Sequence, residues 1–93
     1  MRTIERTKQF KKDYQRELMG KFNKTLERRF TEILQYLVHD SKLPVKYMDH
    51  NLQGEYSDCR DCHIYPDLAL IYQNNTSDIL KLIRLGSHSE LFG

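Results

Sequence analysis

The chain has 93 residues, of which 39% are hydrophobic and 30% are charged, and its formal net charge at pH 7 is +2. This length suffices for one compact domain over residues 1–93 with a modest core, and it excludes a second domain or a deep enclosed substrate chamber. No apolar run approaches the ~20 residues of a membrane span, and the first residues lack the apolar core of a secretory signal. We therefore expect a cytoplasmic globular protein, without a membrane partner, whose site is a surface cleft.

The basic charge is concentrated in the N-terminal third of the chain. Residues 1–30 contain ten Lys or Arg and four Asp or Glu, whereas residues 31–93 contain five and nine. Such a surface attracts phosphate backbones and accelerates encounter with RNA or DNA. A charge-rich helix face is also an ordinary solvated surface, so charge alone leaves both interpretations open.

The periodicity of apolar residues predicts two helices in the N-terminal half. Residues 1–6 form a short extended stretch, and Thr7 is the expected N-cap of the first helix, which ends near Gly20. Asn23 is the expected cap of the second helix, and the Ser-Lys-Leu-Pro segment at 41–44 ends it. The apolar residues at helical spacing are Phe10, Tyr14 and Leu18 in the first helix and Leu26, Phe30, Ile33, Leu34 and Leu37 in the second.

The C-terminal half predicts strands. Segments 59–65, 68–73 and 79–85 have the composition of strands, and residues 74–78 (Asn-Asn-Thr-Ser-Asp) form a turn between the last two. The second and third segments are nearly continuous apolar runs, which is typical of strands buried in the middle of a sheet. We expect an α+β fold in which a small antiparallel meander carries the two N-terminal helices on one face.

A literal match to the motif of covalent haem attachment occurs at Cys59-Arg60-Asp61-Cys62-His63. Haem attachment of this kind belongs to exported chains, and no export signal is visible. In an extended strand Cys59 and Cys62 point to opposite faces, which argues against haem and also against a zinc site. Two reduced cysteines are the favoured interpretation.

Histidines gather where the predicted strands begin and end. Asp61 and His63 share a face of one strand because they are two residues apart, and Asp67 follows at the next corner. His39 ends the second helix, where a histidine is an ordinary structural choice. The histidines at strand ends or in the adjoining loops are His50, His63 and His88.

These groups suit cleavage of a phosphodiester through the ribose 2′-hydroxyl. This reaction needs a base, an acid and positive charge at phosphorus, and histidines can supply acid and base near neutral pH. Arg84 or a protonated histidine can supply the charge, and no metal or other cofactor is required. Two alternatives stay open: a metal-dependent hydrolase that uses the same His/Asp cluster, and a non-catalytic RNA- or partner-binding module.

Three sequence blocks in fixed order carry a family resemblance. They are Asp49–Gly54, Arg60–Asp67 and Arg84–His88, the last followed by Leu91-Phe92. These blocks resemble the YafQ branch of the RelE toxin superfamily. The resemblance implies a bacterial toxin of a toxin–antitoxin pair, an endoribonuclease (mRNA interferase) that cuts translated messenger RNA in the ribosomal A site, with a RelE-like fold.

The resemblance also implies residue roles and partners. By motif, the catalytic residues are His50, His63, Asp67 and His88, and the supporting or substrate-binding residues are Asp61, Arg84 and Phe92. Phe92 is placed to stack on a base, and several relatives carry Trp where this chain has Leu68. The implied partners are a cognate antitoxin protein, the 70S ribosome with its mRNA, and operator DNA only through the antitoxin complex. The basic helices would then lie against ribosomal RNA.

Overall fold

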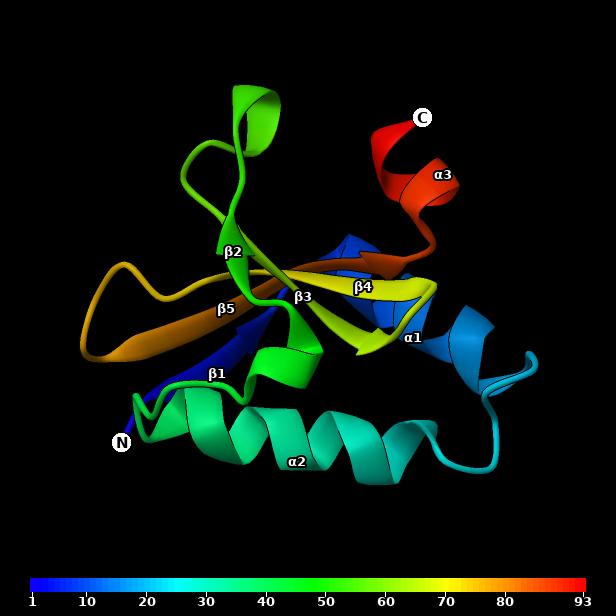
Figure 1. Ribbon diagram of the computed structural model, residues 1–93, viewed down its shortest axis with the longest axis horizontal. Helices are drawn as coiled ribbons and strands as arrows, with labels where there is room; N and C mark the ends of the chain where they lie inside the picture. Colours follow the sequence, from blue (N-terminus) through cyan, green and yellow to red (C-terminus); the bar gives the residue numbers. More distant parts are fainter.

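The computed structural model describes residues 1–93 as a five-stranded sheet with α2 below it and the short C-terminal α3 above it (Figure 1). The strands are β1 (Thr3–Arg6), β2 (His50–Asn51), β3 (Arg60–Tyr65), β4 (Leu68–Gln73) and β5 (Ile79–Gly86). The α-helices are α1 (Lys8–Leu18), α2 (Leu26–Val38) and α3 (His88–Phe92), and the 3₁₀ helices are η1 (Val45–Tyr47) and η2 (Gly54–Tyr56). None of the helices is both long enough and apolar enough to cross a membrane.

The expected α+β fold is confirmed, with one difference in the sheet. The strand order is β1-β5-β4-β3-β2, and β2 to β5 pair in antiparallel fashion as a meander. The N-terminal stretch adds a fifth strand, because β1 pairs in parallel with β5 from Thr3 opposite Ile79 to Arg6 opposite Leu82. The sheet is therefore mixed, because the β1–β5 pair is parallel and the other strand pairs are antiparallel.

The beginning of α2 differs from the sequence-based expectation. Asn23 does not cap the helix, which begins at Leu26 with Thr25 as its N-cap residue. The Thr25 side chain instead forms a hydrogen bond with the hydroxyl of Tyr65, and the ring of Phe22 stacks on the Tyr65 ring at a centroid distance of 4.1 Å. Packing of this turn against the end of β3 has overridden the local capping preference.

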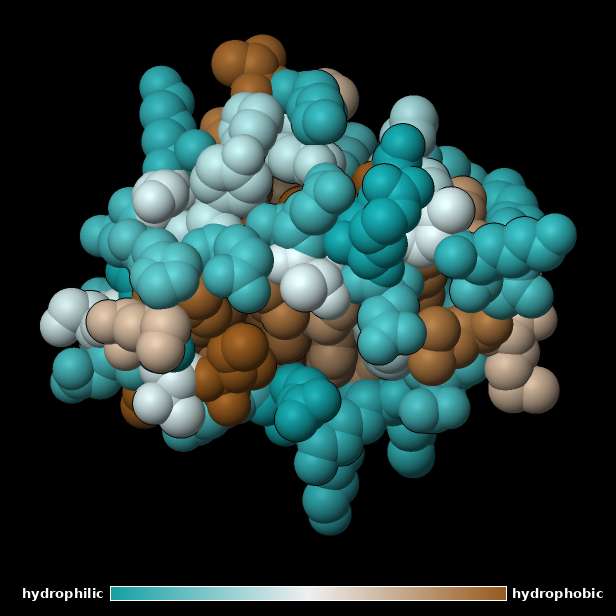
Figure 2. Space-filling model, turned by 90° about the horizontal axis from the view of Figure 1, so that it is seen from below, coloured by the Kyte–Doolittle hydropathy of each residue, from teal (hydrophilic) through white to brown (hydrophobic).

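Both long helices cover one face of the sheet, as expected. The main core contains Phe10 of α1, apolar residues of α2, and the side chains of β3, β4 and β5 that point toward them. On the outer side of α2, hydrophilic side chains surround recessed apolar atoms (Figure 2). Cys62 lies in this core, whereas Cys59 lies in a smaller cluster on the opposite face with Ala69, Ile71 and Leu91 of α3. The two cysteines therefore face apart, which confirms the parity argument against the haem motif.

A buried carboxylate joins α1 to β5. Asp13 is fully buried and accepts hydrogen bonds from Arg84 Nε (2.8 Å), Arg16 Nη1 (2.9 Å) and the amide of Leu85 (3.0 Å). Burial alone would raise the pKa of Asp13, but the hydrogen bonds from Arg84 and Leu85 outweigh it and lower this pKa. Asp13 occupies the apolar face of its helix, three residues after Phe10, and this position is the sequence signal that identifies it.

Substitution of Asp13 by alanine is expected to lower the free energy of unfolding by about 3 kcal/mol, since it leaves Arg84 without its partner. A carboxyl group with a lowered pKa in the folded state stabilises the fold at neutral pH, and this contribution is lost as the pH falls through that pKa. The difference between the variant and the parent should therefore shrink in acid. Urea unfolding at neutral and acid pH measures it, with Glu5→Ala on exposed β1 as the control. Equal stabilities at neutral pH would contradict this role.

Candidate active site

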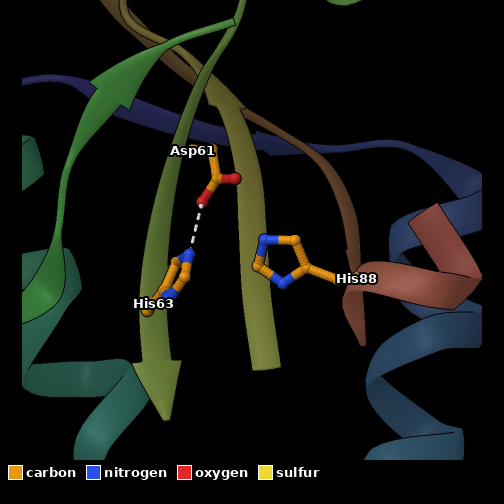
Figure 3. A group of neighbouring side chains, drawn as sticks. All are labelled: Asp61, His63 and His88. Atoms are coloured by element: carbon orange, nitrogen blue, oxygen red, sulfur yellow. Dashed lines mark ion pairs between the residues drawn. The ribbon is translucent and has the colours of Figure 1, made fainter. Parts of the chain in front are cut away.

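The centre of the candidate site is formed by Asp61, His63 and His88. Asp61 and His63 point from the same face of β3, and His88, at the start of α3, reaches toward them from the other side (Figure 3). His63 Nε2 lies 3.6 Å from Asp61 Oδ1, and the His63 and His88 ring centroids are 5.1 Å apart. His63 in β3 and His88, which follows β5, therefore lie close together.

His50 joins this group through the pairing of β2 with β3. His50 lies opposite Asp61 in the ladder, and its Nε2 is 3.7 Å from Asp61 Oδ2. Its Nδ1 lies 2.8 Å from the carbonyl oxygen of Met48. Because a carbonyl oxygen only accepts, Nδ1 carries the proton and Nε2 faces the carboxylate. Each oxygen of Asp61 therefore faces a different histidine.

A polar network fixes the two-residue strand that carries His50. Asp49, just before His50, accepts a 2.8 Å hydrogen bond from Arg60 Nη2 and another from the Tyr72 hydroxyl. Arg60 also donates to the side chain of Asn51. Burial, followed by the hydrogen bond to Asp49, raises the pKa of Tyr72, so its hydroxyl stays protonated and donates. Sequence reasoning did not identify Tyr72 or the role of Arg60, because this network joins three separate segments.

His88 is positioned by a helix cap. Ser87 is the N-cap of α3, its hydroxyl accepts from the amide of Glu90, and Glu90 accepts from the amide of Ser87. This capping box fixes where the helix begins, and His88 is its first residue. Phe92, at the other end of α3, is 43% exposed and its ring centroid lies 5.6 Å from that of His88. An aromatic ring is therefore available beside the histidines, as expected.

The centre of the site contains buried polar atoms without hydrogen-bond partners. Asp61 is 1% exposed and His63 is 9% exposed, and neither Asp61 Oδ1 nor either ring nitrogen of His63 forms a hydrogen bond within the protein. Burial raises the pKa of Asp61, while the neighbouring histidines act in the opposite direction. Since buried polar groups are nearly always paired, unpaired groups in a titratable cluster indicate a functional site.

Three of the remaining residues from the sequence blocks lie outside this centre. Asp67 is exposed in the β3–β4 turn, and its side chain forms no hydrogen bond or ion pair within the protein. Because Ala69 pairs with Gly86, this turn and the start of α3 lie at the same end of the sheet, near His88. Arg84 is bound to Asp13, and Leu68 is buried in the helix-side core, where it cannot stack on a base. The carboxylate at the centre is therefore Asp61, whereas Asp67 lies at the rim.

The same cluster has the composition of a metal site. Ligand atoms of Asp61, His63 and His88 all lie within 4.8 Å of one another. Two imidazole nitrogens and a carboxylate oxygen suit Zn²⁺ or Cu²⁺, which would act there as a Lewis acid. A bound ion would also occupy the nitrogens that proton transfer needs. Metal binding and metal-independent acid–base catalysis are therefore competing uses of this cluster.

The mixed sheet, the two helices on one face and the cluster of three histidines around a buried aspartate define a small α+β protein with a cluster of titratable side chains at one end of its sheet. Residues 2–93 match the family described as bacterial toxin of type II toxin-antitoxin system, YafQ. The chain belongs to this family.

Individual relatives agree with this assignment over their full length. The chain is 37% identical over 93 residues to the mRNA interferase toxin YafQ of Escherichia coli K12, which covers 99% of this chain and 97% of the relative. Its fold is similar to that in the E. coli DinJ–YafQ complex, with a TM-score of 0.80, 33% identity and complete coverage of both chains. A copper-bound mutant toxin from Helicobacter pylori gives a TM-score of 0.88 at 37% identity and covers 99% of this chain and 100% of its own.

Proposed function

We propose that this protein is a ribosome-dependent endoribonuclease that cleaves translated mRNA in the A site by metal-independent acid–base catalysis. The observation that carries this proposal is the set of buried polar atoms on Asp61 and His63 that have no hydrogen-bond partner and that face His50 and His88. The E. coli relative named as an mRNA interferase supports RNA as the substrate. The open face of the cluster, where His50 and His88 are exposed, suits a strand that enters from solvent.

In the proposed reaction a base removes the proton of the ribose 2′-hydroxyl, and the 2′-oxygen attacks the adjacent phosphorus. An acid protonates the departing 5′-oxygen, so the products are a 2′,3′-cyclic phosphate and a 5′-hydroxyl. The neutral form of one histidine serves as base and the protonated form of another serves as acid. Asp61 faces both His50 and His63, and its carboxylate fixes the orientation of their rings. A protonated histidine also stabilises negative charge that develops on the phosphoryl oxygens.

Two rim residues complete the proposed site. Asp67 lies at the end of the sheet where α3 begins, and we assign to it the orientation of the ribose or of a protonated histidine. The exposed ring of Phe92 beside His88 stacks on a nucleobase next to the cut. Arg84 acts indirectly, because it fastens β5 to α1 through Asp13 just before the segment that carries His88.

The proposed biological setting is the bacterial cytoplasm. The DinJ–YafQ complex of E. coli supports a cognate antitoxin as the inhibitory partner of this chain. Operator DNA would be contacted only through the antitoxin complex. The basic side chains of α1 and α2 would lie against ribosomal RNA, where phosphate contacts position the enzyme.

The test is to map cut sites on an mRNA during translation and on the same mRNA free in solution. We expect cuts only in the translated RNA, at one register relative to the ribosomal A site, with 5′-hydroxyl and 2′,3′-cyclic phosphate ends. Equal cutting of free RNA would contradict ribosome dependence. Ends that carry a 5′-phosphate would contradict attack by the 2′-hydroxyl.

Metal removal discriminates between the two uses of the histidine cluster. EDTA is expected to leave the cleavage rate unchanged, and added Zn²⁺ or Cu²⁺ is expected to inhibit, because metal binding would occupy the nitrogens of His63 and His88. Single-turnover cleavage of programmed ribosomes at constant Mg²⁺ measures both effects, and EDTA should reverse the inhibition. Loss of cleavage in EDTA, with recovery on addition of Zn²⁺, would instead support the metal-dependent hydrolase.

A further inference from the structure

A groove extends from the candidate active site along the edge of β3. It has a volume of about 660 Å³ and lies between β3, α2 and η1. β2 pairs only with Arg60 and Asp61, so the rest of β3 has no strand on this side. The residues of β3 that line the groove are His63, Ile64 and Tyr65. The groove is therefore continuous with the histidine cluster through His63.

The groove is basic. Its cationic side chains are Arg28, Arg29 and Lys46, and its one carboxylate is Glu32. Glu32 is already occupied, since it lies 4.0 Å from Arg28 and accepts a hydrogen bond from the Tyr47 hydroxyl. Arg29 and Lys46 form no ion pair within 4.0 Å. Two positive charges without a carboxylate partner therefore lie beside a candidate phosphodiester-cleaving site.

Arg29 is held in a fixed orientation. Its guanidinium stacks on the Tyr65 ring at 4.4 Å from the centroid, and its Nη1 donates a 2.9 Å hydrogen bond to the carbonyl of Ile64. Phe22 stacks on the same ring at 4.1 Å. A guanidinium fixed by stacking and by one hydrogen bond loses little side-chain freedom when its remaining N–H groups bind an anion. Because Ile64 follows His63 in β3, this hydrogen bond holds the guanidinium beside the backbone next to His63.

We propose that this groove is a subsite for the RNA strand, in which Arg29 binds the phosphate next to the scissile one and Lys46 adds a second charge. The proposal rests on the proposed ribonuclease function, since it assigns a path to the substrate of that reaction. An RNA strand carries one negative charge per nucleotide, so a strand cut at His63 brings its next phosphate toward the neighbouring cations. Arg29 stacks on the Tyr65 ring, so we assign to the groove contacts with phosphates and not with bases.

The test is an NMR titration of the ¹⁵N-labelled protein with a short single-stranded oligoribonucleotide whose 2′-hydroxyls are all methylated, which prevents cleavage. We expect shifts at Arg29, Lys46 and Ile64 together with His63. Arg29→Gln should weaken binding about tenfold and should reduce the slope of log K against log salt concentration by about 0.7, the value for one single-strand phosphate contact. Arg29→Lys should keep part of the affinity. The matched control is Arg6→Gln, which removes one exposed charge from β1 at the opposite edge of the sheet.

Three results would overturn the subsite. They are wild-type affinity and salt slope in Arg29→Gln, chemical shifts that change only at the histidine cluster, and no chemical-shift change anywhere in the protein at millimolar oligonucleotide. A loss of affinity for the cognate antitoxin without a loss for the oligonucleotide would instead make the groove a protein-binding surface. None of these results bears on the proposed ribonuclease function, which is judged by the cut sites in translated mRNA. The ¹⁵N spectra of the variants show directly whether each remains folded.

Discussion

Replacement of His88 by alanine is expected to lower the rate of RNA cleavage by about 10²–10⁴-fold while the domain remains folded. His88 is exposed at the start of a five-residue helix whose cap is made by Ser87 and Glu90, so its side chain contributes little to packing. Its ring centroid lies 5.1 Å from that of His63, so His88 is an exposed candidate for proton transfer beside the buried His63. Single-turnover cleavage on programmed ribosomes measures the rate, and thermal unfolding measures the fold.

The pH dependence of the same assay tests the acid–base role. Two histidines that act in opposite protonation states produce a bell-shaped dependence of the cleavage rate on pH. The residual activity of His88→Ala should lose one limb of that bell. The control is His39→Ala, since His39 is exposed at the end of α2 and outside the cluster. Full activity in His88→Ala, with RNA binding that depends on the basic helices, would favour the non-catalytic binding module.

Local sequence patterns were sufficient to predict most of the helices and strands. The three strand segments were predicted within one residue of β3, β4 and β5, because their turns and apolar runs are local features. Thr7 caps α1 through a 2.9 Å hydrogen bond from the Phe10 amide, as its position predicted. The parallel pairing of β1 was not predictable, since a four-residue exposed strand carries no pattern that selects its neighbour.

The sequence predicted that histidines gather at the strand ends, but not how they are arranged around Asp61. Strand parity placed Asp61 and His63 on one face, and the structure adds His50 opposite Asp61. Asp61 was expected to support the site, and its central position became visible only through the pairing of β2 with β3. Asp13 binds Arg84 and Asp49 binds Arg60, and both pairs are distant in sequence, so no local spacing identifies them.

Replacement of Asp61 by asparagine is expected to change activity and stability in opposite directions. The rate of cleavage should fall by about 10²–10⁴-fold, the size of effect seen when a carboxylate that orients a catalytic imidazole loses its charge. The two oxygens of Asp61 face His50 and His63, and an amide would place no negative charge beside these rings. The same change should raise the melting temperature at neutral pH.

The stability gain follows from the sign of the pKa shift. Burial raises the pKa of Asp61, so the folded protein holds this proton more tightly than the unfolded chain does. The free energy of unfolding therefore falls as the pH rises from the ordinary pKa of an aspartate to the raised pKa of Asp61. Above the raised pKa, the buried carboxylate destabilises the fold to its full extent. Asparagine carries no charge, so the gain should be largest at neutral pH and should vanish in acid, where the parent carboxyl is also protonated.

Asp67→Asn is the matched comparison for Asp61→Asn. Asp67 is exposed and without ion pairs, so this variant should keep the parent's melting temperature at neutral pH while it tests the rim carboxylate for a role in cleavage. If Asp61→Asn lowered the melting temperature at neutral pH, the contacts of Asp61 with His50 and His63 would stabilise the fold, contrary to this prediction. A gain in stability together with a loss of cleavage would mean that the buried charge of Asp61 is retained for catalysis although it destabilises the fold. The hydrogen bonds of Asp13, which join α1 to β5, help to offset this destabilisation.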